Sequence, residues 1–166
     1  MILETPRLRL EPLGPQHAAP YRALVQDTRV AATLGGIPDD AAIDAMLARQ
    51  AADWVTNGFG WSAWLDRDTG EFVGRGGIWR VEVDGRDEVE IGWAVVADRW
   101  GEGLATEAAA EHLRWARDVL GLTGIVSFTL PDNRRSRRVM EKLGLGYEKD
   151  IVRGGWPQVL YRQPGG

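Results

Sequence analysis

Two glycines, Gly101 and Gly103, stand where a strand-like stretch, EIGWAVVA (90–97), gives way to a helical pattern. The first amide N–H groups of a helix have no partner within the helix and carry partial positive charge. Phosphate groups bind at such helix ends, and glycine lets them come close to the backbone. The pattern therefore predicts a phosphate-binding turn over residues 101–106. Two glycines that serve only a tight strand-to-helix turn would give the same pattern.

Two well-known phosphate-binding loops do not fit this turn. A Walker A loop needs Gly-Lys-Ser/Thr, but Leu104 and Ala105 follow Gly103. A dinucleotide fingerprint needs a third glycine, and Thr106 holds that position. It also needs an acidic residue near the end of the next strand, where only Asp132 is found. The turn is therefore neither of these two loops.

The strand before the turn carries carboxylates on one face. Its alternation places Val89, Ile91, Trp93 and Val95 on one side and Glu88, Glu90, Gly92 and Ala94 on the other. The small residues Gly92 and Ala94 leave space beside Glu90. Glu90 is therefore the first candidate for a functional carboxylate and Glu88 the second. The alternative is that both are solvated carboxylates on an outer face of the sheet.

The elements that position these residues alternate between strands and helices. Strands are expected at 7–13, 61–66, 71–83, 88–96, 124–130, 146–153 and 158–163, and helices at 15–27, 40–56, 103–120 and 134–143. Asp84-Gly85 is a strong hairpin signal. The order predicts an α/β fold in which helices flank a mixed sheet, with a parallel crossover through the helix at 103–120.

The composition excludes several classes of site. The 166 residues predict one domain, 1–166, and the net charge of −4 does not favour nucleic acid or an anionic membrane as partner. The absence of cysteine excludes disulfides, thiolate metal sites and cysteine nucleophiles, and favours the cytoplasm. No apolar run approaches the about 18 residues of a membrane span. The two histidines, His17 and His112, are too far apart in sequence to predict a metal site.

A basic run, RRSRR (134–138), invites a nucleic-acid interpretation. No aromatic residue interrupts this run, and the rest of the chain is acidic. We therefore expect these arginines to form a solvated face that reaches a phosphate of a cofactor, and we expect no nucleic-acid partner.

Two longer stretches together carry a family resemblance. EIGWAVVADRWGEGLATEA (90–108) followed by PDNRRSRRVMEKLGLGYE (131–148) resembles the GCN5-related N-acetyltransferases (GNAT), and most of all their RimJ/RimL-like branch. LETPRLRLEPL (3–13) and QVLYR (158–162) are similar to that branch too. The resemblance implies a mixed, mostly antiparallel seven-stranded sheet flanked by about four helices, with a central β-α crossover at 88–130.

The resemblance also implies which residues hold the cofactor, acetyl-CoA. The family's pyrophosphate loop, Q/R-x-x-G-x-G/A, falls on residues 100–105, with Trp100 in place of Gln or Arg. The end of the preceding strand, around Val95, would pair with the pantetheine arm, and Asn133 matches an asparagine that contacts the cofactor. The cofactor-binding residues implied in this way are Val95, Trp100, Gly101, Glu102, Gly103, Leu104, Ala105, Thr106 and Asn133.

Acetyl transfer from a thioester to an amine needs a base, an oxyanion donor and an acid for the thiolate. Glu90 is the expected base, and a backbone N–H near Ala94 or Val95 is the expected oxyanion donor. Many family members place a tyrosine acid where Met140 stands, so Ser136, on the inward face of its helix, is the expected thiolate partner. The alternatives are that Ser136 is a small helix residue and that Asn133 is only the helix cap.

The resulting hypothesis is an N-acetyltransferase that moves acetyl from acetyl-CoA to a primary amine by direct attack in a ternary complex. The amine would belong to a protein or peptide N-terminus or to a small molecule. We expect it between the loop 34–38, the helix 40–56, Trp61 or Trp64, and the segment 154–158. The alternatives are a non-catalytic CoA-binding module and an acyltransferase that uses another acyl-CoA, such as succinyl-CoA. The sequence leaves the oligomeric state open, and a homodimer is one assembly that it allows.

Overall fold

The computed structural model describes residues 1–165 and is built around one sheet. The strands are β1 (Leu3–Glu4), β2 (Leu8–Pro12), β3 (Trp61–Asp66), β4 (Phe72–Val83), β5 (Arg86–Val95), β6 (Val126–Thr129), β7 (Gly146–Arg153) and β8 (Trp156–Arg162). Their order across the sheet is β1-β2-β3-β4-β5-β6-β8-β7. Neighbouring strands are antiparallel except β5 and β6, which are parallel and are joined by the crossover that the sequence predicts.

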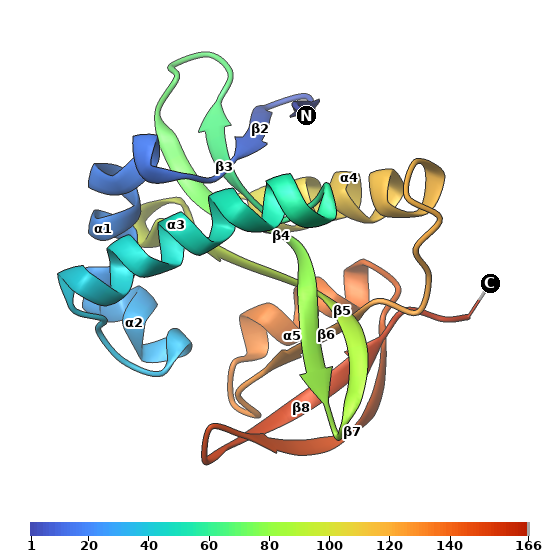
Figure 1. Cartoon of the computed structure of the whole chain (residues 1–166). Coiled ribbons are helices and arrows are strands. Elements are labelled where there is room, and N and C mark those ends of the chain that lie inside the picture. The colour runs from blue at the N-terminus through green and yellow to red at the C-terminus, as the bar shows by residue number, and fades with distance from the viewer. Residues whose placement is uncertain (166) are drawn as a thin grey trace.

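Five α-helices accompany the sheet (Figure 1). They are α1 (Ala18–Gln26), α2 (Thr28–Leu34), α3 (Asp40–Asn57), α4 (Leu104–Asp118) and α5 (Arg134–Lys142), and short 3-10 turns occur at Pro15–His17 and Ala97–Arg99. The first three helices pack in one apolar cluster with Trp61, Ala63 and Ala94 of the sheet. Helices α4 and α5 belong to a second cluster with Trp64, Ile78, Ile91 and Val95. The two clusters therefore cover opposite faces of β3, β4 and β5.

Residues 1–165 form eight strands and five α-helices, one strand and one helix more than the expected seven strands and about four helices. The additional strand is the two-residue β1, which pairs with β2. The additional helix is α2, over residues for which the sequence predicts no element. Asp27 ends α1 in an extended conformation and caps α2 by accepting a hydrogen bond from the Arg29 amide at 2.9 Å. Gly35, with φ of 88°, ends the helix.

Two turns have the geometry that their residues favour, and the sequence predicts the first of them. Asp84 and Gly85 both have positive φ and connect β4 to β5 as a two-residue hairpin. Gly58, at φ of 74°, ends α3 immediately before β3. These local signals determine where β3, β4 and β5 begin and end, and so which side chains reach the sheet faces.

The parallel pair β5 and β6 has the shortest register in the sheet. It contains one position, Glu90 opposite Val126. Beyond this position β5 stays paired with β4 as far as Val95 and β6 stays paired with β8, but β5 and β6 share no further pair. The two strands therefore separate on the side where α4 begins. Among residues 1–165, no helix is both long and apolar enough to cross a bilayer.

Candidate active site

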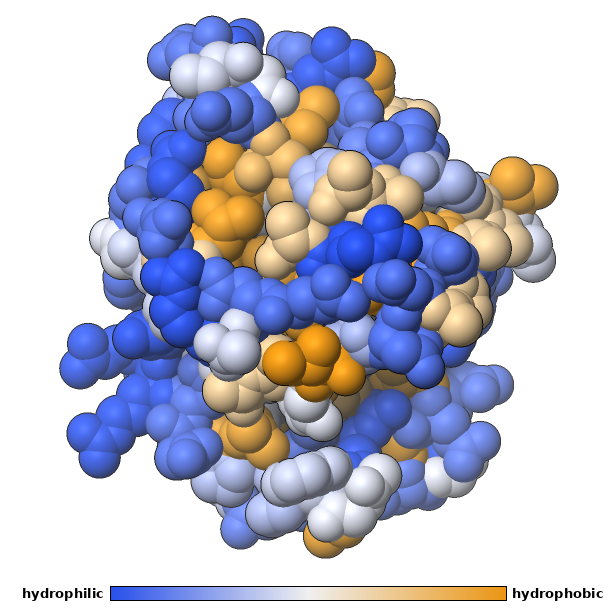
Figure 2. Space-filling model, turned by 90° about the vertical axis from the view of Figure 1, so that its left-hand side faces the viewer, coloured by the Kyte–Doolittle hydropathy of each residue, from blue (hydrophilic) through white to orange (hydrophobic). Residues whose placement is uncertain are grey.

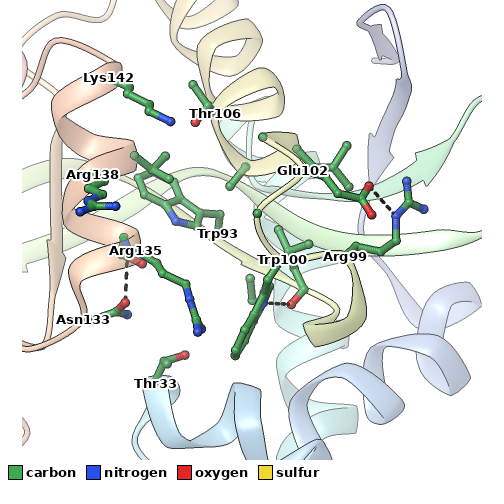
Figure 3. A pocket seen from close by; sticks show the side chains of 18 of the residues that line it. Thr33, Trp93, Arg99, Trp100, Glu102, Thr106, Asn133, Arg135, Arg138 and Lys142 are labelled. Carbon is green, nitrogen blue, oxygen red and sulfur yellow. Dashed lines mark hydrogen bonds and ion pairs between the residues drawn. The ribbon is translucent and has the colours of Figure 1, made fainter.

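One cavity lies at the separated ends of β5 and β6. It has a volume of about 580 Å³ and is bounded by the end of β5, the start of α4 and one side of α5 (Figure 3). All nine residues that the sequence resemblance assigns to the cofactor line it: Val95, Trp100, Gly101, Glu102, Gly103, Leu104, Ala105, Thr106 and Asn133. We call this space the α4 cavity.

The start of α4 supplies the α4 cavity with free backbone donors. Gly101 and Gly103 have φ of 82° and 81°, a left-handed conformation that favours glycine, so the turn itself requires both residues. No side chain caps the helix. Within residues 1–165, none of the amides of 101–106 donates a backbone hydrogen bond. A diphosphate fits this arrangement, because it can accept from amides that would otherwise lack partners.

Cations from α5 face the same amides. Arg135, Arg138 and Lys142 line the α4 cavity from the side opposite the glycine turn (Figure 3). Arg99 lines it too, but its guanidinium is bonded to Asp66 and to Glu102, which directs the Glu102 carboxylate away from the amides. The basic run that the sequence reading assigned to a solvated, phosphate-contacting face therefore does reach this cavity.

Trp100 connects the two sides of the α4 cavity. Its indole Nε1 donates to the carbonyl oxygen of Val95 at 2.9 Å, and the Arg135 guanidinium stacks over its ring at 4.2 Å. The Val95 carbonyl, which faces the gap between β5 and β6, is thus already bonded. Val96 donates its amide to Val73 of β4 at 2.9 Å. Since successive amides of a strand point in opposite directions, the Val95 N–H points into the gap.

A second cavity, of about 330 Å³, adjoins the first and is called here the Glu90 cavity. Four residues line both cavities: Thr33, Trp93, Asn133 and Ser136. The Glu90 cavity is further lined by the end of α2 and by strands β3 to β8. Figure 2 shows the face that carries α1 and α2, on which apolar patches are interrupted by hydrophilic side chains and the lower half is hollowed.

Glu90 is a buried carboxylate in the wall of this second cavity. It is 5% exposed, and burial raises the pKa of its carboxyl well above the ordinary value, although Arg153 and Arg75 oppose that rise. The space expected beside it is present as this cavity, but Trp79 takes part of it. A Cβ on Gly92 would lie 2.9 Å from the Trp79 ring, so the missing side chain of Gly92 makes room for that indole.

The sequence reading missed Arg75, which also lines the Glu90 cavity. Its side chain is 6% exposed and lies over the Trp61 ring at 3.8 Å. Burial lowers the pKa of the guanidinium, while Tyr21 and Glu90 act against that shift. The available signal was a charged residue inside an otherwise apolar, glycine-rich strand, FVGRGGI (72–78).

Ser136 and Asn133 lie where the two cavities meet. Asn133 accepts a hydrogen bond from the Ser136 amide at 3.3 Å and donates from Nδ2 to Thr129 at 3.0 Å. Asn133 is therefore the cap of α5, as its alternative interpretation holds, and it lines both cavities as well. Ser136, in the first turn of α5, is positioned by that cap.

Several residues considered from the sequence lie elsewhere. Glu88 is bonded to Arg162, which lowers the pKa of its carboxyl, and it lines neither cavity. Trp64 is fully buried on the opposite face of β3, so Trp61 alone of the two tryptophans reaches the Glu90 cavity. Trp156, the first residue of β8, lines that cavity and is 56% exposed. No residue of α3 lines it.

Neither histidine lies in either cavity. His112 is buried against Ser62 and Ala108, and burial lowers its pKa to about 4, so the ring is neutral. No group of three potential metal ligands occurs in the part of the chain that the structure describes.

Comparisons with known proteins agree with this geometry. The acetyltransferase (GNAT) domain model matches residues 7–146. The chain belongs to the GNAT acetyltransferase family. It is 30% identical to the uncharacterised protein YkkB of Bacillus subtilis, with 97% of this chain and 94% of that protein covered. It is 34% identical to the FsC-acetyl coenzyme A-N(2)-transacetylase of Aspergillus fumigatus, covering 86% of this chain and 64% of that protein.

Solved structures show the same fold. An acetyltransferase from Agrobacterium tumefaciens has a TM-score of 0.86 and 29% identity, with 99% of this chain and 95% of that chain covered. As a GNAT acetyltransferase, the protein is an N-acetyltransferase, and acetyl-CoA is its acetyl donor. Its acceptor is an amine.

Proposed function

We propose that the protein acetylates a primary amine by direct attack, with acetyl-CoA in the α4 cavity and the amine in the Glu90 cavity. The observation that carries the proposal is the shared wall. Thr33, Trp93, Asn133 and Ser136 border both spaces, so a donor in one cavity and an acceptor in the other would meet there. The free amides of 101–106 and the α5 cations suit a diphosphate, and the buried Glu90 suits an amine.

Acetyl-CoA supplies the acetyl group as a thioester. Glu90 takes a proton from the acceptor ammonium, because only the neutral amine has the lone pair that attacks the acyl carbon. The Val95 N–H, which points into the gap, donates to the carbonyl oxygen as negative charge develops on it. The C–N bond forms as the C–S bond breaks. Ser136 gives its proton to the departing thiolate and takes up the second proton that the attacking nitrogen loses, so that free CoA thiol and a neutral amide are released.

The finer parts of this proposal rest on the sequence. The RimJ/RimL-like assignment rests on the motifs at 90–108 and 131–148, and a cytoplasmic location rests on the absence of cysteine. Acetyl transfer by one domain, 1–166, belongs to the same proposal. The alternatives of a non-catalytic CoA-binding module and of a larger acyl donor are outcomes of its test.

The test measures binding and turnover separately. CoA is expected to raise the melting temperature of the protein, because a ligand that binds only the folded state stabilises it. Thiol release from acetyl-CoA is then screened against peptides, amino acids, polyamines and aminoglycosides, with succinyl-CoA as a parallel donor. Stabilisation by CoA without thiol release for any amine and either donor would identify a binding module. No stabilisation at millimolar CoA would remove the cofactor assignment.

A further inference from the structure

The Glu90 cavity is where most of the unsatisfied buried polar atoms are found. In residues 1–165, six buried side-chain nitrogen or oxygen atoms have no hydrogen-bond partner. Four of them belong to residues that line this cavity: Trp61 Nε1, Arg75 Nε, Arg153 Nη1 and Gln158 Oε1. Buried polar atoms are nearly always paired in folded proteins, so this concentration marks the wall of the Glu90 cavity as short of hydrogen-bond partners.

Two of these four residues are arginines that aromatic rings hold in place. The Arg75 guanidinium lies over the Trp61 ring at 3.8 Å, and the Arg153 guanidinium lies over the Phe128 ring at 4.2 Å. A ring against one face of a guanidinium leaves the N–H groups at its edge available. A planar carboxylate is a matching partner, because it accepts two parallel hydrogen bonds from that edge.

The charges of the cavity support the same partner. Its ionisable lining residues are Arg75, Glu90 and Arg153, which leaves an excess of positive charge. Glu90 is the carboxylate whose charge acts on both arginines. One negative charge therefore faces two positive ones in this cavity, and a ligand anion would supply the second. Polyamines and aminoglycosides would add further positive charge to this cavity.

We propose that the acceptor is a small primary amine that carries a carboxylate, as an amino acid does. Arg75 and Arg153 hold the carboxylate, and Glu90 faces the amine. This inference rests on the proposed function, because it identifies the acceptor class of the same site. It distinguishes a free amino acid from a peptide N-terminus, whose backbone carboxyl is an uncharged amide.

The protonation step is compatible with two arginines beside one base. Glu90 receives the ammonium proton and becomes neutral, and the carboxylate of the acceptor then remains as the counter-ion of the two guanidiniums. A neutral or cationic acceptor would leave both guanidiniums without a counter-ion after that transfer. Because Glu90 loses its negative charge in this step and both guanidiniums stay positive, the cavity favours an acceptor that carries a negative group before and after the proton transfer.

The first experiment compares matched acceptors. Thiol release from acetyl-CoA is measured for amino acids, their α-carboxamides and their decarboxylated amines, with spermidine and kanamycin as cationic acceptors. We expect kcat/KM to be about tenfold or more higher for the carboxylates, because each alternative leaves a charged donor unpaired. Equal or higher values for the carboxamides or the cationic amines would overturn the inference.

The second experiment uses variants of the two arginines. Arg153→Gln and Arg75→Met are expected to raise KM for the preferred amino acid by about 10- to 100-fold. Both acceptors should also lose some kcat, because each arginine lowers the pKa of Glu90, so kcat/KM for the decarboxylated amine should fall by a clearly smaller factor than kcat/KM for the amino acid. Arg80→Gln is the matched control, because Arg80 of β4 also lies near an aromatic ring, at 5.7 Å from Phe59, and lines neither cavity. Equal losses on both acceptors would mean that the arginines are only structural.

A binding measurement separates this inference from the proposed function. Calorimetric titration with N-acetylated amino acids and their N-acetylated amides needs no turnover. Preferential, Arg153-dependent binding of the carboxylates without acetyl transfer to any amine would overturn the proposed function and keep the anion site. Acetyl transfer to amines without preference for carboxylates in turnover or binding would overturn the anion site and keep the proposed function. Absence of both would overturn both.

Discussion

The two cavities differ in the kind of group that each offers a ligand. The α4 cavity presents backbone amides of a helix start and the cationic side chains of α5. The Glu90 cavity presents buried side chains, Glu90 and Arg75, whose pKa values are shifted by burial. The first arrangement depends on backbone conformation and tolerates changes of side chain. The second depends on individual side chains. Substituting one residue of the Glu90 cavity is therefore expected to reduce catalysis or acceptor binding more than substituting one side chain of the α4 cavity reduces CoA binding.

The largest effect is expected in the Glu90 cavity. Glu90→Gln is expected to lower kcat by about 10²- to 10⁴-fold, because the amide cannot accept the ammonium proton. CoA affinity, measured by calorimetry, should not change. In the wild type, activity should fall as the pH is lowered through the raised pKa of Glu90, and the variant should lack that dependence. A variant with the wild-type rate would exclude Glu90 from the mechanism.

A comparable loss in the α4 cavity requires a change of backbone. Gly103→Val is expected to abolish the stabilisation by CoA, because a branched residue at φ of 81° disfavours the turn by about 1–2 kcal/mol and crowds the free amides. Gly144→Val is the matched control, since Gly144 also has φ of 81° but lines neither cavity. If the control lost the CoA shift equally, the effect would be due to instability alone.

A smaller effect is expected where the cavities meet. Ser136→Ala should lower kcat by about tenfold, because the thiolate loses its proton donor. The affinity for CoA should be retained, since the Ser136 amide that Asn133 caps is unchanged. Thiol release at saturating acetyl-CoA measures the first quantity and calorimetry the second. A rate equal to that of the wild type would leave Ser136 as a small residue of the helix.

Neutralising single cations of the α4 cavity should have a modest effect. Arg138→Gln and Lys142→Gln are each expected to weaken CoA binding by about two- to fivefold at low salt, and less as salt screens the interaction. Arg114→Gln is the control, because Arg114 is paired with Glu111 and lies outside both cavities. Weakening that did not depend on salt would argue against contact with a phosphate.

The smallest effect concerns stability. A carboxyl with a raised folded-state pKa contributes stability at low pH that is lost as the pH rises through that pKa. Glu90→Gln removes this loss, so its melting temperature should exceed that of the wild type by roughly a few degrees at pH 8 and by less at pH 5. Thermal unfolding over this pH range is the measurement. If the difference in melting temperature did not change with pH, Arg75 and Arg153 would fully offset the effect of burial on the pKa of Glu90.

Local signals were sufficient for most of the fold. Asp39 and Gly58 cap the two ends of α3, and Asp84-Gly85 forms a hairpin turn. Each of these features depends only on residues that are adjacent in the sequence. The missed helix α2 also had a local signal, the Asp27 cap and the Gly35 end, but it follows α1 so closely that periodicity alone did not separate them.

The sequence by itself determined the glycine turn, because the left-handed conformation at 101 and 103 and the free amides after it depend on neighbouring residues only. The tertiary structure decided the Glu90 cavity. Arg75 and Arg153 come from strands far apart in the chain, and their aromatic supports, Trp61 and Phe128, come from two others. Burial, which shifts the pKa of Glu90 and leaves one nitrogen of each guanidinium without a hydrogen-bond partner, is a property of that assembly and of no single segment.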